Sequence, residues 1–178
     1  MEFIIRQERT EDYSLTENVV ERAFADAEHS DHNEHKLVSR IRKSNAFIPS
    51  LSLVAVDQND DKIVGHILLS KLKIRNENRT AESLALAPVS VIPEYQNRGV
   101  GKQLIHAALQ QAKKMGYESV VVLGHPPYYP KFGFKKASLW GIQAPFEVPD
   151  EAFMAMELQE GALGHVSGLV EYPSVFFE

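Results

Sequence analysis

Apolar residues in the middle of this chain change from a nearly continuous run to a helical spacing, which predicts a strand followed by a helix. The run covers residues 84–92 and contains one proline, Pro88. The apolar positions that follow are Val100, Leu104, Ala108, Ala112 and Met115, with Ile105 and Leu109 widening the stripe. Gly116 comes directly after this stripe, where a helix commonly ends. We therefore predict a buried strand over 84–92 and an amphipathic helix over 100–115.

The residues before this strand–helix unit show further apolar runs and further helical spacings. The predicted elements are a strand over 3–6, helices over 15–27 and 37–41, and strands over 51–56 and 62–74. Turn-forming residues connect strands two, three and four, so these strands are expected to form an antiparallel meander. In the far half of the third strand, Leu72 and Ile74 alternate with basic residues, which predicts one buried face and one wet face.

The residues after the helix begin with a β-branched run, Ser119–Leu123, that predicts a buried fifth strand. A strand–helix–strand unit over 84–123 should place its two strands parallel. Residues 124–134 hold three prolines and predict at most one helical turn. Two further strands are expected over 137–144 and 153–158, and another around 166–172.

Pro88 has two interpretations. Proline lacks a backbone donor, so a strand that contains one lies at a sheet edge or carries a bulge. The apolar character of the run is compatible with both.

A short loop with two glycines stands between the strand and the helix. It reads Gln96-Asn97-Arg98-Gly99-Val100-Gly101-Lys102. The first backbone N–H groups of a helix have no intrahelical partner and carry partial positive charge. Glycine lets a bulky anion approach this backbone, and Arg98 and Lys102 add positive charge. The pattern is typical of a phosphate or pyrophosphate site.

Two common nucleotide motifs do not fit this loop. A P-loop requires glycine where Gln96 stands and a hydroxyl where Gln103 stands, so a nucleotide hydrolase is excluded. A dinucleotide fingerprint requires a third glycine where Leu104 stands. Its glycines must also follow the strand directly, whereas residues 93–96 intervene here.

Composition narrows the class of protein further. The chain has 178 residues, 44% of them apolar, which is enough for one domain with one core. Its net charge of -5 argues against a protein that binds nucleic acid or anionic membranes non-specifically. The absence of cysteine excludes disulfides and thiolate metal sites, and fits a cytoplasmic location. No apolar run reaches the length of a membrane span or of a signal-peptide core.

Two sequence words together resemble a known family. Gln96, Gly99 and Gly101 match the pattern Gln/Arg-x-x-Gly-x-Gly/Ala, and Tyr129-x-x-x-Gly133-Phe134 matches a second word downstream. Both are similar to motifs of the GNAT N-acetyltransferase superfamily. The resemblance implies an α+β fold with a mixed, mostly antiparallel sheet of six to seven strands and about four helices, in which strands four and five splay apart. It implies a single domain over residues 1–178, with 161–178 as a C-terminal extension.

The same resemblance implies roles for individual residues. Acetyl-CoA would be the acetyl donor, with no metal, and its pantetheine arm would pair with the backbone of Val89 and Val91 beside a bulge in the fourth strand. The pyrophosphate would lie against Gln96, Asn97, Arg98, Gly99, Val100, Gly101 and Lys102. Tyr129 would donate a proton or hydrogen bond to the leaving thiolate, with Tyr128 as the neighbouring alternative. An amine would attack the thioester directly.

Several points stay open from the sequence. The general base is Glu82, Ser83, a water relay or a backbone carbonyl, and the acceptor is an amine of a small molecule or a protein. His29, His32 and His35 are interpreted as solvated residues, with a metal site or a substrate contact as the alternatives. Trp140 and Phe146 pack in the core or line the acceptor side. The alternative functions are a non-catalytic acyl-CoA sensor and a transferase of longer acyl groups. The protein is expected to be a monomer or homodimer.

Overall fold

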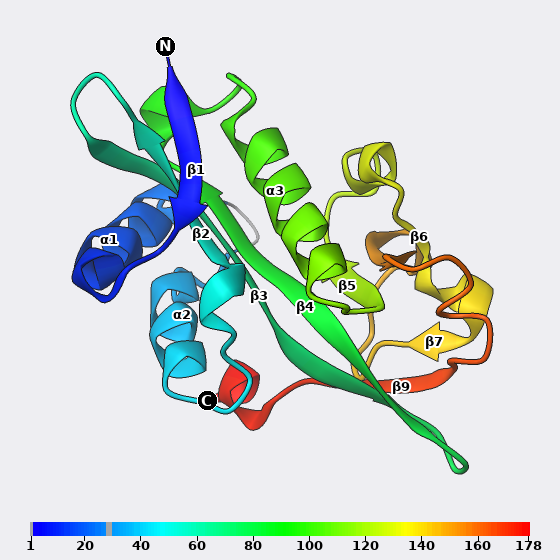
Figure 1. Ribbon diagram of the computed structural model, residues 1–178. Helices are drawn as coiled ribbons and strands as arrows, with labels where there is room; N and C mark the ends of the chain where they lie inside the picture. The colour runs from blue at the N-terminus through cyan, green and yellow to red at the C-terminus, as the bar shows by residue number, and fades with distance from the viewer. Residues whose placement is uncertain (1, 28–29) are drawn as a thin grey trace.

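A mixed β-sheet forms the centre of the molecule, and helices cover both of its faces (Figure 1). The computed structural model describes residues 2–27 and 30–178. The strands are β1 Phe3–Gln7, β2 Ser52–Asp57, β3 Lys62–Arg75, β4 Thr80–Val91, β5 Ser119–Leu123, β6 Lys135–Lys136, β7 Ile142–Gln143, β8 Phe153–Glu157 and β9 Gly168–Glu171. The α-helices of the described residues are α1 Tyr13–Phe24, α2 Glu34–Arg42 and α3 Val100–Lys114.

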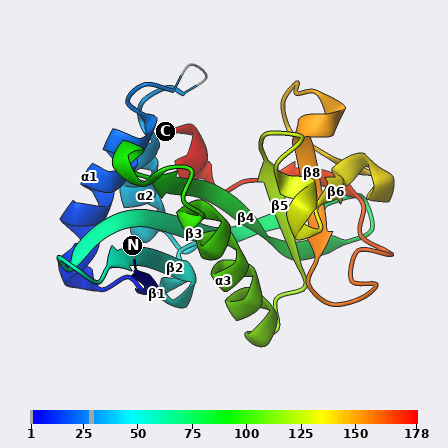
Figure 2. The same ribbon diagram turned by 90° about the horizontal axis from the view of Figure 1, so that it is seen from above.

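The order of the strands confirms the predicted topology. The sheet runs β1-β2-β3-β4-β5-β8-β6, with antiparallel pairing from β1 to β4. Strands β4 and β5 are parallel, as expected for a strand–helix–strand unit. Seen from above, β5, β8 and β6 form a group apart from β1–β4, with α3 between the two groups (Figure 2).

The prediction of one strand over residues 137–144 is wrong. Ala137–Trp140 forms a 3-10 turn, Gly141 follows at φ 72°, and only Ile142–Gln143 is extended. Leu139 is 67% exposed, whereas Ala137 and Ile142 are buried. Side chains alternate between the two faces of a strand, so an extended chain would place Ala137 and Ile142, five residues apart, on opposite faces. Because the C-terminal region is divided in this way, the sheet has nine strands, more than expected, alongside three α-helices in the described part of the chain.

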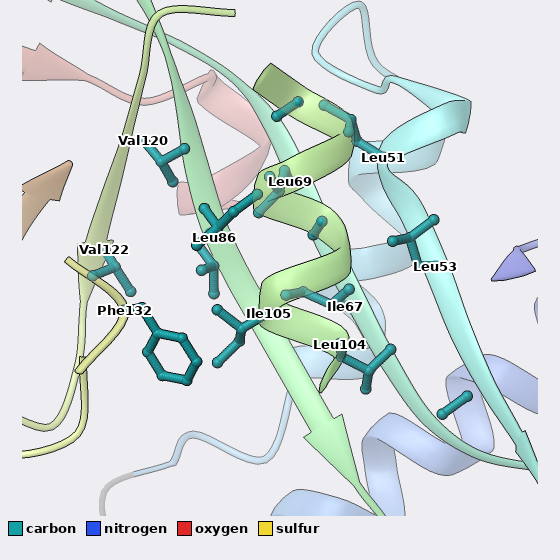
Figure 3. Packing of buried hydrophobic residues seen from close by; sticks show 14 of the residues in the cluster. Leu51, Leu53, Ile67, Leu69, Leu86, Leu104, Ile105, Val120, Val122 and Phe132 are labelled. Atoms are coloured by element: carbon teal, nitrogen blue, oxygen red, sulfur yellow. The ribbon is translucent and has the colours of Figure 1, made fainter. Parts of the chain in front are cut away.

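Alternation along β3 explains why the two faces carry different helices. Ile67 and Leu69 pack in the cluster that contains α3, together with Leu104 and Ile105 (Figure 3). Leu68 points to the opposite face and packs against α1 and α2. Further along β3, Leu72 and Ile74 are buried and the basic residues between them are exposed, as predicted.

Strand β4 carries the bulge. Ile67 of β3 pairs with Val89 and Leu69 pairs with Leu86, so two residues of β4, Ala87 and Pro88, lie opposite one residue of β3. The alternative of an edge strand is wrong, because β4 pairs with β3 on one side and with β5 on the other. An extra residue changes which face the following side chains occupy. Leu84 and Leu86 face α3 before the bulge, and Val89 and Val91 face it afterwards.

The C-terminal tail is part of the sheet and of the far layer. Strand β9 pairs antiparallel with β3 over Lys73–Arg75, on the edge that β2 does not reach. The last turn, Ser174–Phe177, lies beside α2, where Arg40 Nε donates to the Val175 carbonyl at 2.9 Å (Figure 1).

A buried polar network joins β1, β2, β3 and α2. Ser52 Oγ donates to Glu8 Oε1 at 2.7 Å and lies 2.9 Å from His66 Nε2, while Arg42 pairs with Glu8. A hydroxyl has one proton, so His66 must donate from Nε2 to Ser52, which leaves its buried Nδ1 as an acceptor without a partner in the described residues. His66 is thus a fully buried histidine of the core.

The network predicts how stability changes with pH. Burial lowers the pKa of His66 from 6.5 to about 4, opposed by Glu8 and assisted by Arg42. Below pH 6.5 the unfolded chain binds a proton at this position and the folded chain does not. The free energy of unfolding should therefore fall as pH drops from 6.5 towards 4, by up to about 3 kcal/mol from this residue.

Urea unfolding across this pH range tests the assignment. His66→Gln should flatten the fall in unfolding free energy, whereas His165→Gln, at an exposed position, should leave it unchanged. An equally steep fall in His66→Gln would assign the pH dependence to other groups.

Candidate active site

Helix α3 begins at a left-handed turn that presents its first amides to solvent. Gly99 is the residue before the helix and has φ 81°, and Asn97 also has a positive φ of 63°. The first hydrogen bond of the helix runs from Gln103 N–H to the Gly99 carbonyl at 3.1 Å. The amides of Val100, Gly101 and Lys102 therefore precede the intrahelical ladder, and no side chain of the described residues caps them.

A surface pocket of about 360 Å³ lies in front of these amides. It is lined by Val91, Tyr95, Gln96, Asn97, Gly99, Val100, Gly101, Lys102 and Tyr128. The two glycines serve different needs. A Cβ at Gly99 would meet open space, so the positive φ is what requires glycine there. A Cβ at Gly101 would lie 3.6 Å from the Tyr128 hydroxyl and 3.7 Å from Val91, so a larger side chain would fill the pocket.

The loop that carries the glycines is held from two sides. Tyr95 Oη donates to Asp57 Oδ2 at 2.7 Å, which ties the loop to the end of β2. This bond, after one from the Asn59 amide, lowers the pKa of Asp57. Glu94 pairs with Arg22 of α1 at 2.6 Å, although both side chains are exposed and the pair contributes little stability. The loop is thus positioned by contacts with distant parts of the chain.

Beside the pocket, the two parallel strands are separated. Strands β4 and β5 pair only at Leu84–Val120 and Ala85–Val121, where Ser83 Oγ and Ser119 Oγ also lie 2.7 Å apart. Beyond that point the bulge has changed the phase of β4. The Val91 carbonyl accepts a hydrogen bond from Gln96 Nε2 at 2.9 Å, so it points away from β3. Val89, two residues earlier, presents its backbone to the same side.

Tyr129 lies on a 3-10 turn, Tyr129–Phe132, after β5 ends. Gly133 ends this turn at φ 106°, and Phe134, which is buried, meets the Tyr129 ring edge-on with centroids 5.7 Å apart. The word Tyr-x-x-x-Gly-Phe therefore encodes a turn, its left-handed end and an anchor for the tyrosine ring.

Tyr128 and Tyr129 differ in their surroundings. The Tyr128 ring lines the pocket at the glycine turn, whereas Tyr129 is 8% exposed and packs beside it with ring centroids 5.2 Å apart. Burial raises the pKa of Tyr129 to about 12, with Tyr128 adding to the effect. Burial also raises the pKa of Tyr128. The Tyr129 hydroxyl has no hydrogen-bond partner among the described residues and carries its proton at neutral pH.

Gly124 is the residue that sequence reasoning missed. A Cβ there would lie 2.2 Å from Tyr129 Cε2, so the tyrosine ring occupies the space of the absent side chain. Nothing local in the sequence indicates this contact, except that Gly124 stands between a buried strand and the tyrosine pair.

The structure brings most of the predicted cofactor residues to one pocket. Val91, Gln96, Asn97, Gly99, Val100, Gly101 and Lys102 line it, while Val89, Arg98 and Tyr129 do not. Val89 packs on the core beneath α3, and the Arg98 guanidinium lies 5.5 Å from the centre of the Tyr95 ring. Tyr129 is connected to the pocket through Tyr128.

Among the described residues, the histidines considered as metal ligands or substrate contacts, and the side chains considered as general bases, lie outside the anion pocket. His35 pairs with Glu21, and His32 Nδ1 lies 2.9 Å from the Phe24 carbonyl. His29 lies outside the described residues, and within them there is no cluster able to hold a metal ion. Ser83 of β4 is buried with its hydroxyl against Ser119 of β5, and Glu82 is exposed.

The separated strands and the glycine turn at α3 are the features expected of the acyltransferase class whose two motifs the sequence resembles. A family model described as an acetyltransferase (GNAT) domain matches residues 5–137. The chain therefore belongs to the GNAT N-acetyltransferases.

Individual relatives agree with this assignment. The Escherichia coli protein named as the uncharacterised N-acetyltransferase YjhQ is 38% identical over 141 residues, which is 79% of this chain and 74% of the relative. The crystal structure of Escherichia coli YhbS in complex with CoA has a TM-score of 0.88 at 28% identity, covering 99% of this chain and 92% of that one. A GNAT acetyltransferase from Brucella melitensis in complex with acetyl-CoA has a TM-score of 0.80 at 30% identity, covering 98% of each chain.

Among the described residues, every helix is too short or too polar to cross a membrane.

The close approach at Gly124 makes a testable prediction. Gly124→Ala should displace the Tyr129 ring and destabilise the fold by about 1–3 kcal/mol, because an added methyl group overpacks a filled space. In a Tyr129→Ala background, the same substitution should cost much less, because the space is then empty. Chemical unfolding of the four variants of this cycle measures the coupling. Equal costs in both backgrounds would contradict the assigned contact.

Proposed function

We propose that the protein transfers the acetyl group of acetyl-CoA to a primary amine, with the pyrophosphate held at the N-terminus of α3. The observation that carries this proposal is the row of uncapped amides at Val100–Lys102, which faces a pocket between a glycine turn and Val91. Amides at a helix N-terminus bind anions through hydrogen bonds and the helix dipole. CoA and acetyl-CoA in the crystal structures of two similar proteins support the choice of ligand.

The pantetheine arm extends from this pocket into the space between β4 and β5. Val89 and Val91 direct their backbone groups towards that space, and an extended arm pairs with them as a further strand would. Gln96 already donates to the Val91 carbonyl, so this residue positions the loop as well as lining the pocket. Lys102 supplies positive charge to the diphosphate from the lining of the pocket, and Arg98 adds to it from its position over the Tyr95 ring. The tail, 161–178, belongs to the same domain, since β9 completes the edge of β3.

In the reaction, the amine nitrogen attacks the thioester carbonyl carbon, a C–N bond forms and the C–S bond breaks. The electron pair leaves with the sulfur, and the nitrogen loses its proton to water. We assign Tyr129 as the donor that meets the developing thiolate. A phenol with a pKa of about 12 keeps its proton at neutral pH, so it stabilises the leaving group by a hydrogen bond in a site with little water. Direct attack needs no enzyme nucleophile, and the chain has no cysteine.

Free thiol release from acetyl-CoA in the presence of primary amines tests the activity directly. Acetyl-CoA binding without thiol release from any amine would instead indicate an acyl-CoA-binding module.

A substitution at Gly101 tests the anion site. Gly101→Leu should weaken acetyl-CoA binding at least about tenfold, because its side chain fills the pocket between Tyr128 and Val91. Isothermal titration calorimetry measures the dissociation constant. Gln103→Leu is the matched control, since it adds the same side chain to the first turn of α3 outside the pocket. Unchanged affinity in Gly101→Leu would contradict the placement of the pyrophosphate at this turn.

Substitutions of the two tyrosines test the donor. Tyr129→Phe should lower kcat by about 10²–10³-fold, the usual loss of one donor to a developing charge, and leave the acetyl-CoA dissociation constant nearly unchanged. Tyr128→Phe should affect acetyl-CoA affinity more than kcat, because its hydroxyl lies at the glycine turn. Steady-state kinetics and calorimetry on both variants separate the two effects. The opposite result would transfer the donor role to Tyr128.

A further inference from the structure

A second pocket opens at the same strand separation, and its walls come from three distant parts of the chain. It is a small pocket of about 260 Å³. Its lining residues are Leu37, Ala85, Leu86, Ala87, Val121, Leu123, Phe146, Tyr172, Phe176 and Phe177. Strands β4 and β5 supply its floor, α2 supplies one wall, and the residues after β7 supply the other.

This pocket lies on the face of the sheet opposite to α3. Leu84 and Val120 pack beneath α3, whereas their neighbours Ala85 and Val121 pack with the C-terminal segments. The anion pocket, in contrast, includes the first turn of α3 itself. The two pockets therefore approach the gap between β4 and β5 from opposite faces. A donor bound in one and an acceptor bound in the other would meet at the gap.

The second pocket is aromatic, and none of the described residues that line it carries a charged side chain. Tyr172 stacks on Phe146, with ring centroids 6.1 Å apart and planes at 19°, and also contacts Phe176 and Phe177. Leu123, Phe146 and Phe177 are 47%, 39% and 65% exposed. Single exposed apolar residues are common, but several around one concave site indicate a binding surface.

We infer that this pocket holds the acceptor, a small primary amine attached to an aromatic or similarly flat apolar group. The inference rests on the proposed acetyl transfer and deepens it by naming the acceptor class. The position supplies the first reason, because the pocket opens at the β4–β5 gap on the face that the anion site leaves free. The lining supplies the second, because apolar side chains bind rings and alkyl groups, and the described lining residues include no carboxylate to pair with a polycation. The volume supplies the third, because a pocket of about 260 Å³, just below the usual range for ligand pockets, fits only a small molecule.

The same lining favours the reactive form of the amine. An ammonium group transferred to an apolar site loses solvation, so its pKa falls and the neutral nucleophile becomes more populated. A carboxylate in the lining would have the opposite effect by stabilising the ammonium form. The pocket therefore assists deprotonation without a dedicated base, and the proton leaves through water. This places the acceptor's amino end at the gap and its apolar end among Phe146, Tyr172 and Phe177.

A neighbouring groove is the competing location for a more polar acceptor. It is lined by Asn45, Ala46, Lys71, Leu72, Lys73, Glu82, Glu171, Tyr172 and Pro173. Its two acidic residues face two lysines, and Glu171 also pairs with Arg75 at 3.3 Å. This balance of charge gives a diamine no net attraction, so the aromatic pocket is favoured.

Initial rates of thiol release at saturating acetyl-CoA test the inference with four primary amines. The amines are 2-phenylethylamine, ethylamine, putrescine and the tripeptide triglycine. We expect kcat/KM for 2-phenylethylamine to exceed that of each other amine at least about tenfold, mainly through KM, because burial of a phenyl group contributes to binding.

Two substitutions locate the effect in this pocket. Phe146→Ala and Phe177→Ala should each raise KM for 2-phenylethylamine several-fold to about tenfold, and KM for ethylamine much less. Both positions are partly exposed, so the fold should persist, and thermal unfolding checks this. Leu139→Ala is the matched control, since it removes an exposed apolar side chain outside the pocket.

The outcomes separate this inference from the proposed function. A preference for putrescine or triglycine, no acetylation of any amine, or an unchanged amine preference in both phenylalanine variants would overturn the aromatic acceptor site. Acetyl-CoA binding measured by calorimetry on the same samples would then still support the anion site. Absence of acetyl-CoA binding would overturn both.

Discussion

The separation of β4 from β5 is the constraint on which the rest of the site depends. Two parallel strands that stayed paired would close the sheet and leave no passage between its faces. Here they pair at two positions only, joined there by Ser83 and Ser119, and the bulge at Ala87 and Pro88 then changes the phase of β4. A bulge bends a strand and re-aims its side chains, so Val89 and Val91 come to face α3. The backbone beyond the bulge is left to bind something other than β5.

Small residues stand where larger ones would block this arrangement, and for three different reasons. Gly99 allows the left-handed turn that exposes the amides of α3, and Gly101 keeps the pocket in front of them open. Gly124 leaves room for the Tyr129 ring at the end of β5. The turn, the pocket and the position of the tyrosine thus depend on glycines at the start of α3 and in the loop after β5.

The pockets on the two faces of the sheet at this gap have opposite chemical character. The pocket on the α3 face offers uncapped amides, with Arg98 and Lys102 nearby, which suits a diphosphate. The pocket on the opposite face, beside the C-terminal turn, offers aromatic rings and no charged side chain among its described lining residues, which suits an apolar amine. Tyr129 lies between buried rings, where its raised pKa keeps it a hydrogen-bond donor. The tail contributes through β9 and Tyr172, so it takes part in the fold and in the pocket.

Local patterns in the sequence determined the strands and helices from β1 to β5, the parallel unit around α3 and the family, because periodicity and the two motif words depend on residues close together in the chain. They failed over residues 137–144, where burial of Ala137 and Ile142 is decided by the segments packed around them. The choice between a bulge and an edge strand at Pro88 needed the partners of β4 on both sides. The contact of Gly124 with Tyr129, the exclusion of Tyr129 from the pocket that Tyr128 lines, and the aromatic pocket were decided only by the tertiary structure. Each of these features depends on contacts between residues that are brought together only by folding, and no local sequence pattern indicates such contacts.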